Sequence, residues 1–570
     1  MPHTDIALAT HRHQQNDPGS DTTDLTVSDD QAENSPIEPS GWLTASPFGL
    51  IGGLWQFIPR YVKVQFLSAF ILGLLVHMYL MVNGFINQDS VSARVDNHLW
   101  AGFISGRWFA DIPDSISSHF NLPWVNSLFS VVYISIACCL IGICLRITRT
   151  PLVVVLSAVV VSFPAVACAL SYRLDSDVHF FAALLACLAV YMTYRFRFGF
   201  AAGVPLLTFS LATYQAHVGF FVGIAILILV REVLTTDKLR PVLVHAGTYF
   251  LTLVLAGVAY AISVKLTIVG WGPGYHDLSD LGGVSPSSIL NGLGVSYSNT
   301  FDIFVRNSLL IHQGAGQNSH LYGYVFLIIG LIVVGLLVSV VIDKQVFRDP
   351  SRLIVLIVLV GLVPAGVNFI AVLTPTTLYI LMQYSLVLLF AFALMVVDIA
   401  VIPAAERRSL TRTRVTHLGT YLILAFCCAV ALNYALYSNI FYSKMDLVNK
   451  QGQAFSTELV TRIQSQNDYT PTMPVVLLGS PQQSWALGDF ESIYAIPLEG
   501  IPNMYAYPAY LLTFLDLQNP MAPASKDTAS LPPPLEGDAS AVAAIQQMPQ
   551  YPVDGSIMAV DGFMVVKLSG

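Results

Sequence analysis

Charged side chains are scarce in this chain of 570 residues, and their scarcity excludes several classes of protein. Asp, Glu, Lys and Arg make up 11% of the residues, whereas a soluble domain carries about 25%. Hydrophobic residues make up 55%, which is too many for a disordered chain. The formal net charge of −8 provides no basic surface for nucleic-acid phosphates. The class that remains is a polytopic membrane protein, which is embedded in a lipid bilayer and binds no nucleic acid.

Cysteine motifs and a signal peptide are also lacking. The seven cysteines all lie in apolar runs, and no CxxC pair or Cys/His cluster has zinc spacing. We interpret them as small buried hydrophobic residues. The first 45 or so residues hold eight Asp and Glu against Arg12 alone and no apolar segment. They predict a disordered acidic tail, which with an interfacial lead-in extends over residues 1–60.

Long apolar segments are the dominant feature of the rest of the chain. Crossing a membrane takes about 20 apolar residues, and eleven segments are candidates: 63–85, 125–146, 151–170, 178–194, 199–213, 216–231, 243–266, 321–342, 353–373, 378–401 and 417–438. The fifth and sixth are short and meet at Tyr214-Gln215, so they form two spans, one bent element or a hairpin that does not fully cross. The sequence predicts an all-α polytopic membrane domain over residues 61–440.

Lys and Arg are distributed unequally between the two sides of this arrangement. With the N-terminus inside, sixteen lie in inner loops and their flanks, and five lie in outer loops before the last span. The positive-inside rule then places the N-terminus in the cytoplasm. The long loops 86–124 and 267–320 and residues 441–570 lie outside. Helical periodicity at 454–466, a strand at 474–479 and a hairpin at Asp561-Gly562 predict a small α/β domain there.

Polar residues gather on this outer side in three segments. The first outer loop carries Asp89, Arg94, Asp96, Trp100 and Arg107; the second carries Tyr172, Arg173, Asp175 and Asp177; the fifth and sixth apolar segments meet at Tyr214, Gln215 and His217. Each has a structural alternative. Asp89 can cap a helix over 91–103, and Arg107 can form a surface ion pair worth about 0–1 kcal/mol. Within the spans, His77 and His245 are interpreted as packed polar groups, and the scarcity of ionisable residues argues against a proton-coupled pump.

A carboxylate, arginines and aromatic rings beside a bilayer suit the transfer of a sugar from a lipid phosphate. A fixed carboxylate can take the proton of a hydroxyl, which accelerates reactions by about 10²–10⁴-fold. Arginine can hold a departing phosphate through two parallel hydrogen bonds. Two alternatives stay open. One is a flippase or transporter for a lipid-linked sugar, with spans broken at Pro164 and Pro364, and the other is a polymerase or ligase of surface polysaccharide.

The order of these motifs resembles that of the bacterial GtrII-like glucosyltransferases, which modify O-antigen and related surface polysaccharides. The resemblance rests on Asp89, Arg94 and Gly106-Arg107, on SYRLDSD after the third span, on YQ at 214–215, and on the run from ALNYAL to PVVLLG. It covers residues 60–480. It implies a GT-C architecture, an active site on the outer leaflet side, a polyprenyl-phosphate sugar as donor, with glucose as the expected sugar, and a cell-surface polysaccharide as acceptor.

The resemblance also implies roles for individual residues. Asp89 matches the essential acidic residue of the first outer loop and is expected to be the base that activates the acceptor hydroxyl, with inversion at the anomeric carbon. Arg94, Arg107 and Arg173 are expected to bind the donor phosphate. The residues expected to orient sugar or acceptor are Asp96, Trp100, Tyr172, Asp175, Asp177, Tyr214, Gln215 and His217. Many GT-C enzymes have an acidic pair at this position, whereas Gln88-Asp89-Ser90 holds one carboxylate. We therefore expect a metal-independent reaction without a cofactor. The resemblance also implies that the protein lies in the bacterial plasma membrane.

Overall fold

A computed structural model describes most of the chain. The described residues are 55–84, 87, 90, 105–117, 119, 122–173, 175–268, 286–306, 319–375, 378–401, 410–479, 507–522, 525 and 527–569. The predicted acidic tail therefore lies outside the described residues. Residues Met1–Pro59 form a unit separate from Arg60–Gly570, and the fold below is that of the second unit.

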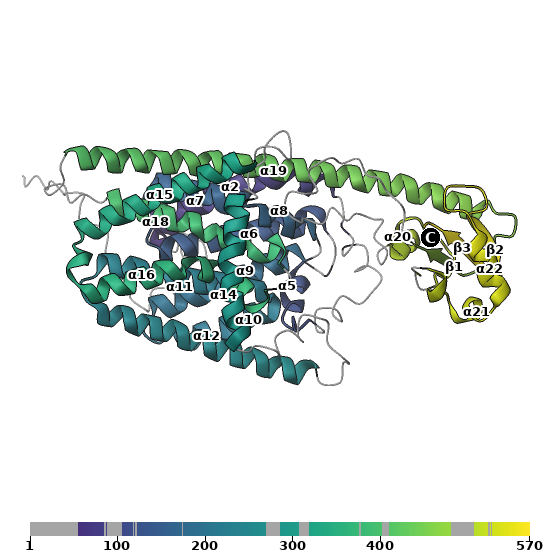
Figure 1. The fold of residues 1–570 in the computed structure, drawn as a ribbon, viewed down its shortest axis with the longest axis horizontal. Helices are drawn as coiled ribbons and strands as arrows, with labels where there is room; N and C mark the ends of the chain where they lie inside the picture. Colours follow the sequence, from purple (N-terminus) through teal and green to yellow (C-terminus); the bar gives the residue numbers. More distant parts are fainter. Residues whose placement is uncertain are drawn as a thin grey trace, which may run out of the picture. The chain divides into compact units, whose positions relative to one another are not determined.

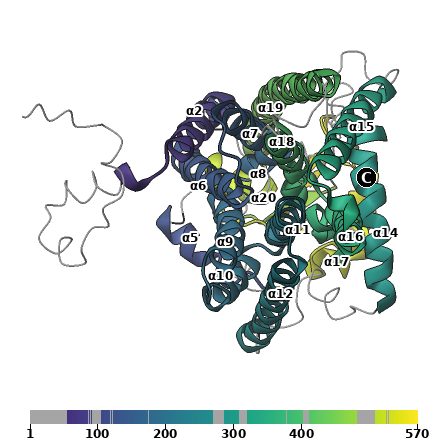
Figure 2. The same cartoon turned by 90° about the vertical axis from the view of Figure 1, so that its left-hand side faces the viewer.

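Apolar helices that run side by side make up most of this unit (Figures 1 and 2). Among the described residues, nine elements are long and apolar enough to span a membrane, and a bent pair adds a tenth. The nine are α2 (Arg60–Asn83), α6 (Pro123–Cys144), α9 (Ser176–Arg195), η1 with α11 (Gln215–Thr235), α12 (Leu239–Ile268), α15 (Ser319–Asp343), α16 (Pro350–Val367), η4 with α18 (Ile380–Val401) and α19 (Leu410–Gln464); the bent pair is α7 (Thr150–Ser162) and α8 (Pro164–Ser171). The predicted all-α membrane fold is confirmed in this form.

The predicted count of eleven spans is not confirmed, and the fifth segment explains the difference. It forms α10 (Phe200–Thr213), a helix of 14 residues, which is about 21 Å long at 1.5 Å per residue. The hydrocarbon core of a bilayer is about 30 Å thick. α10 packs along α9 and α12 and turns back at Tyr214 into η1 and α11, which is the hairpin alternative rather than one bent element.

A proline separates α7 from α8. Pro164 has no N–H to donate to Val160, the residue four positions earlier, and its ring disfavours a continuous helix, so the two helices meet at 41°. Side chains from other spans bond to the carbonyls at this break. The Tyr384 hydroxyl donates to the Val160 oxygen at 2.9 Å, and His77 Nε2 donates to the Val161 oxygen at 2.9 Å. Hydrocarbon cannot supply such donors, so these contacts are what make the break tolerable.

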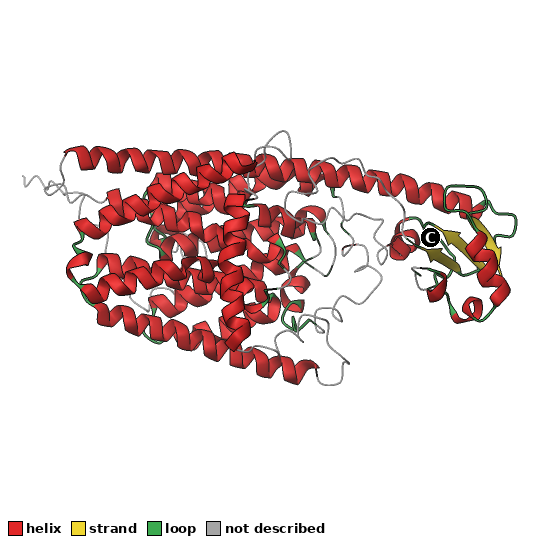
Figure 3. Cartoon of the chain, in the orientation of Figure 1, coloured by secondary structure: helices red, strands yellow, loops and turns green. Residues whose placement is uncertain are grey.

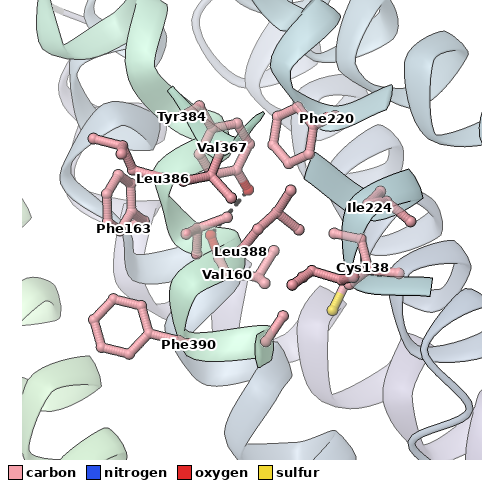
Figure 4. Packing of buried hydrophobic residues seen from close by; sticks show 14 of the residues in the cluster. Cys138, Val160, Phe163, Phe220, Ile224, Val367, Tyr384, Leu386, Leu388 and Phe390 are labelled. Carbon is pink, nitrogen blue, oxygen red and sulfur yellow. Dashed lines mark hydrogen bonds between the residues drawn. The ribbon is translucent and has the colours of Figure 1, made fainter. Parts of the chain in front are cut away.

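Tyr384 is also part of the hydrophobic core between the spans (Figure 4). Its ring lies edge-on to Phe220 and Phe180, with centroids 5.1 and 5.8 Å away. His77, predicted to be a packed polar group, accepts a hydrogen bond from the Tyr442 hydroxyl at 2.7 Å through its second ring nitrogen. The core therefore joins α2, α7, η4 and α19 through hydrogen bonds as well as apolar contacts.

The second possible helix break, at Pro364, is absent. α16 continues through Pro364 to Val367, and the short α17 (Phe369–Leu373) follows after Asn368. The second long loop contains α14 (Pro286–Phe301), which packs against α16 and α17 and runs across the spans in Figure 1.

The C-terminal residues build a small three-stranded sheet (Figure 3). β3 (Phe563–Lys567) is central, parallel to β1 (Val475–Leu478) and antiparallel to β2 (Ile557–Val560). The hairpin expected at Asp561-Gly562 is present, and both residues have positive φ, 46° and 82°, as a tight hairpin turn requires. The end of α19 packs on this sheet, and the helices that accompany it are α20 (Tyr507–Phe514), α21 (Pro533–Glu536) and α22 (Ala539–Gln547).

The bond at the Pro164 break can be tested with Tyr384→Phe. This substitution keeps the ring and removes the donor to the Val160 carbonyl, so we expect the free energy of unfolding to fall by about 1–3 kcal/mol. Unfolding in mixed detergent micelles, followed by circular dichroism, measures the change. Tyr421→Phe is the control, because the Tyr421 side chain is 68% exposed. Pro164→Ala supplies a backbone N–H near Val160, so Tyr384→Phe should cost less in that background; equal costs in both backgrounds would contradict this account.

Candidate active site

Four of the residues predicted to form the site lie outside the described residues. They are Asp89, Arg94, Asp96 and Trp100. The other eight are described, and they come from three segments: the end of the first outer loop, the turn before α9, and the turn between α10 and α11. Contacts between these segments define the candidate site.

The end of the first outer loop is held against α10 and α12. Gly106 has a φ of 75°, a backbone conformation that favours glycine, and it turns the chain so that the next residues meet these helices. The Phe109 N–H donates to the Ala212 oxygen at 2.9 Å, and the ring of Phe109 stacks on Phe209 with centroids 4.3 Å apart. Trp108 Nε1 donates to the Ser263 hydroxyl at 3.0 Å. The two residues that follow Arg107 are therefore fixed to both helices.

Gln215 fastens the same segment from the other side. Its Nε2 donates to the Ser105 carbonyl oxygen at 2.8 Å and lies 2.7 Å from the Tyr260 hydroxyl. Gln215 was predicted to orient sugar or acceptor, and these contacts instead assign its amide nitrogen to positioning the loop. Tyr260 was not predicted, because a tyrosine inside the apolar α12 has no distinctive sequence pattern.

Arg107 and Tyr214 form the centre of the candidate site. The guanidinium carbon of Arg107 lies 4.7 Å from the centroid of the Tyr214 ring, within the range of a cation–π interaction. No carboxylate of a described residue forms an ion pair with Arg107, so the surface ion pair considered above is absent there. Arg107 Nε is buried and has no hydrogen-bond partner among the described residues. The arginine is thus positioned by an aromatic face, and its Nε–H donor is unused among the described residues.

Two buried histidines lie against the same tyrosine. The ring centroids of His179 and His217 lie 4.2 and 5.2 Å from that of Tyr214. Neither nitrogen of His217, and not Nδ1 of His179, has a hydrogen-bond partner in the described part of the chain. Buried polar atoms are nearly always bonded, and each one left unpaired costs about 1–3 kcal/mol. The unpaired nitrogens of the two histidines and of Arg107 therefore point to a polar ligand, and the positive charge of the guanidinium favours an anionic one.

His179 had no predicted role, although it lies within the second polar segment. It follows Asp177 by two residues in SYRLDSDVH, a position that by itself is compatible with a solvated loop. The structure instead places His179 in the first turn of α9, where its side chain is buried and its neighbours in the helix are buried as well. Only its contact with Tyr214, a residue 35 positions later, distinguishes it as a site residue.

The site lies at the start of α9. The Ser210 hydroxyl, near the end of α10, donates to the Ala182 oxygen at 2.8 Å, and Ala182 is six residues after the start of α9 at Ser176. α10 runs antiparallel to α9, so Tyr214, four residues after Ser210, lies beside His179 in the first turn of α9. Arg107 meets Tyr214 at this end of α9.

The remaining described candidates lie around this centre in supporting positions. Arg173 is buried and donates through its guanidinium to the Gly84 carbonyl at the end of α2, so it fixes the start of the first outer loop. Asp175 precedes α9, and its carbonyl accepts from the His179 N–H at 3.0 Å. Asp177 is wholly buried in the first turn of α9. Tyr172 packs against the core at the end of α8.

Comparison with known proteins supplies the family. A family model described as Glucosyl transferase GtrII matches residues 78–401, more than half of the chain, including all the candidate residues above. No curated protein and no solved structure matches the chain. The match confirms the resemblance seen in the sequence over this range, although the motifs beyond residue 401 lie outside it. A membrane protein of apolar helices that carries this match is a glycosyltransferase by family: the chain belongs to the GtrII glucosyltransferase family.

Proposed function

We propose that this protein transfers a sugar, glucose by family expectation, from a polyprenyl-phosphate donor to a cell-surface polysaccharide. The reaction takes place on the outer side of the bacterial plasma membrane, with a GT-C architecture around it. The observation that carries the proposal is Arg107, which lies on the Tyr214 ring beside two buried histidines with unpaired nitrogens. This arrangement supports binding of an anion next to an apolar helical bundle. The head group of a lipid phosphate is such an anion.

Arg107 is the best-supported ligand of the donor phosphate. Its guanidinium can donate two parallel hydrogen bonds to phosphate oxygens, and a charge-assisted pair of this kind is stronger than a neutral one. Water is largely excluded from the buried histidines, which strengthens electrostatic attraction. Arg94 remains a predicted second ligand, whereas Arg173 already donates to Gly84 and we assign it to positioning the loop.

Asp89 is proposed as the general base. It would take the proton from the acceptor hydroxyl while the hydroxyl oxygen attacks the anomeric carbon. The bond from that carbon to the phosphate oxygen breaks, polyprenyl phosphate leaves with the electron pair, and the configuration inverts. Gly84, five residues before Asp89, accepts a hydrogen bond from Arg173. The start of the segment that carries Asp89 is therefore tied to the turn before α9, the helix that bears His179.

The base is tested with Asp89→Asn, which keeps the side-chain size and removes the proton acceptor. Membranes that contain the protein receive radiolabelled polyprenyl-phosphate glucose and envelope polysaccharide, and the label in polysaccharide is counted. We expect transfer to fall by about 10²–10⁴-fold. Asp302→Asn is the matched control, because Asp302 is an outer-loop carboxylate paired with Arg306 at 2.9 Å. Equal transfer by the two variants would rule out Asp89 as the base and leave the enzyme class intact.

The phosphate ligand is tested with Arg107→Lys, which keeps the charge and loses the two-bond geometry. We expect transfer to drop by at least about tenfold, with a raised KM for the donor, since a single lost transition-state donor commonly costs about 10²–10³-fold. Arg146→Lys is a close control, because Arg146 lies over the Tyr194 ring at 5.9 Å on the predicted inner side. An unchanged donor KM in Arg107→Lys would argue against phosphate binding by Arg107.

The same assay separates the alternatives. Transfer of label to polysaccharide by the wild type supports a transferase. If label never moves with several donor sugars, while labelled lipid crosses vesicle membranes that contain the protein, the transferase proposal is wrong and the flippase alternative holds. If the labelled polysaccharide grows by whole repeat units, the polymerase or ligase alternative holds.

A further inference from the structure

A second cluster of ionisable side chains lies on α5 (Asp111–Ile116) and the turn that follows it. Asp111 and Asp114 are three residues apart, so they share one face of this helix. His119 Nδ1 lies 2.9 Å from Asp114 Oδ2 and 3.7 Å from Asp111 Oδ1. One ligand atom from each of the three residues lies within 4.8 Å of the others. A metal with bonds of about 2.1 Å holds its ligand atoms about 3–3.5 Å apart, so small side-chain rotations are enough to enclose an ion.

Asp177 provides an independent indication of a cation. Its side chain is 0% exposed, and its Oδ2 has no hydrogen-bond partner among the described residues. α5 packs against α9. Asp177 accepts a hydrogen bond from Ser117, the residue after α5, and lies close enough to Asp114 for the two carboxylates to affect each other. The unpaired Oδ2 of Asp177 therefore lies at the contact with α5, where burying a second carboxylate oxygen is favourable only if a positive charge is shared between them.

We propose that Asp111, Asp114 and His119, with Asp177 behind them, bind one divalent cation of the Mn²⁺ or Zn²⁺ type. The donor set determines this class. Mg²⁺ and Ca²⁺ prefer sites made of oxygen ligands, whereas an imidazole combined with carboxylates suits Mn²⁺, Fe²⁺ and Zn²⁺.

The cation would fasten the first outer loop to α9. Asp111 follows Arg107 by four residues, and Asp177 precedes His179 by two, so the ion would hold together the two segments that bear on Tyr214. This inference goes beyond the proposed sugar transfer, and no step of that reaction passes through the ion. The expectation of a metal-independent reaction concerns the chemistry at Asp89, whereas the cation proposed here has a structural role at other residues.

The test is a Mn²⁺ titration of the full-length protein. The protein is purified in detergent, stripped with EDTA and titrated with Mn²⁺, and free Mn²⁺ is measured by electron paramagnetic resonance. We expect one tightly bound ion per chain. Asp111→Asn and His119→Gln replace partly exposed side chains that the fold tolerates, and each should raise the Kd by at least about tenfold, since even supporting ligand partners commonly contribute 10–100-fold.

The matched control is His245→Gln. His245 Nδ1 also lies 2.9 Å from a carboxylate, Glu232, but the described residues offer no third ligand there. The Kd of the His245→Gln variant for Mn²⁺ should equal that of the wild type. A thermal melt is the second readout, because Mn²⁺ should raise the Tm of the wild type and of His245→Gln by mass action and leave Asp111→Asn unchanged. Wild-type protein that binds neither Mn²⁺ nor Zn²⁺, or binding that is equal in all variants, would overturn the proposal; neither result depends on a transferase assay.

Discussion

Hydrocarbon offers no hydrogen bonds, and the arrangement of this protein follows from that constraint. Where a helix breaks, a side chain from another span takes the place of water. Tyr384 and His77 bond to the carbonyls beside the Pro164 break, and Ser385 donates to the Val367 carbonyl at 2.7 Å where α16 ends. Against this background of paired groups, the unpaired nitrogens of His179 and His217 stand out. The same rule that explains the core therefore identifies the site.

Much of the fold could be predicted from the sequence because long apolar runs and turn residues act locally. The spans follow from hydropathy, the break follows from Pro164, and the C-terminal hairpin follows from Asp561-Gly562. The number of spans could not be predicted in this way. Whether α10 crosses the bilayer depends on the depths in the membrane at which its two ends, Gly199 and Tyr214, lie. Packing against α9 and α12 determines these depths, and the composition of the segment does not.

The candidate site was predicted in part, and the reason lies in distance along the chain. Motif order correctly led to the GtrII family, and polar residues on one side of the membrane led to Arg107, Tyr214 and His217. The contacts of the site join residues 35 to 110 positions apart, which no local pattern reveals, so His179 and Tyr260 were missed. Arg173 and Gln215 were predicted to bind ligands, but both donate hydrogen bonds to backbone carbonyls of the first outer loop, at Gly84 and Ser105. Asp89 lies outside the described residues and stays a prediction.

The burial of His179 and His217 has a consequence for selectivity. An anion that binds between Arg107 and the two histidines must give up hydration, because both imidazoles are buried against the Tyr214 ring. Dehydration costs more for a small, doubly charged anion than for a singly charged one with an apolar tail. Burial of this kind favours ligands that lose little hydration free energy. For the donor proposed above, the apolar tail can remain in hydrocarbon while only the phosphate meets the arginine, whereas free inorganic phosphate must be dehydrated completely.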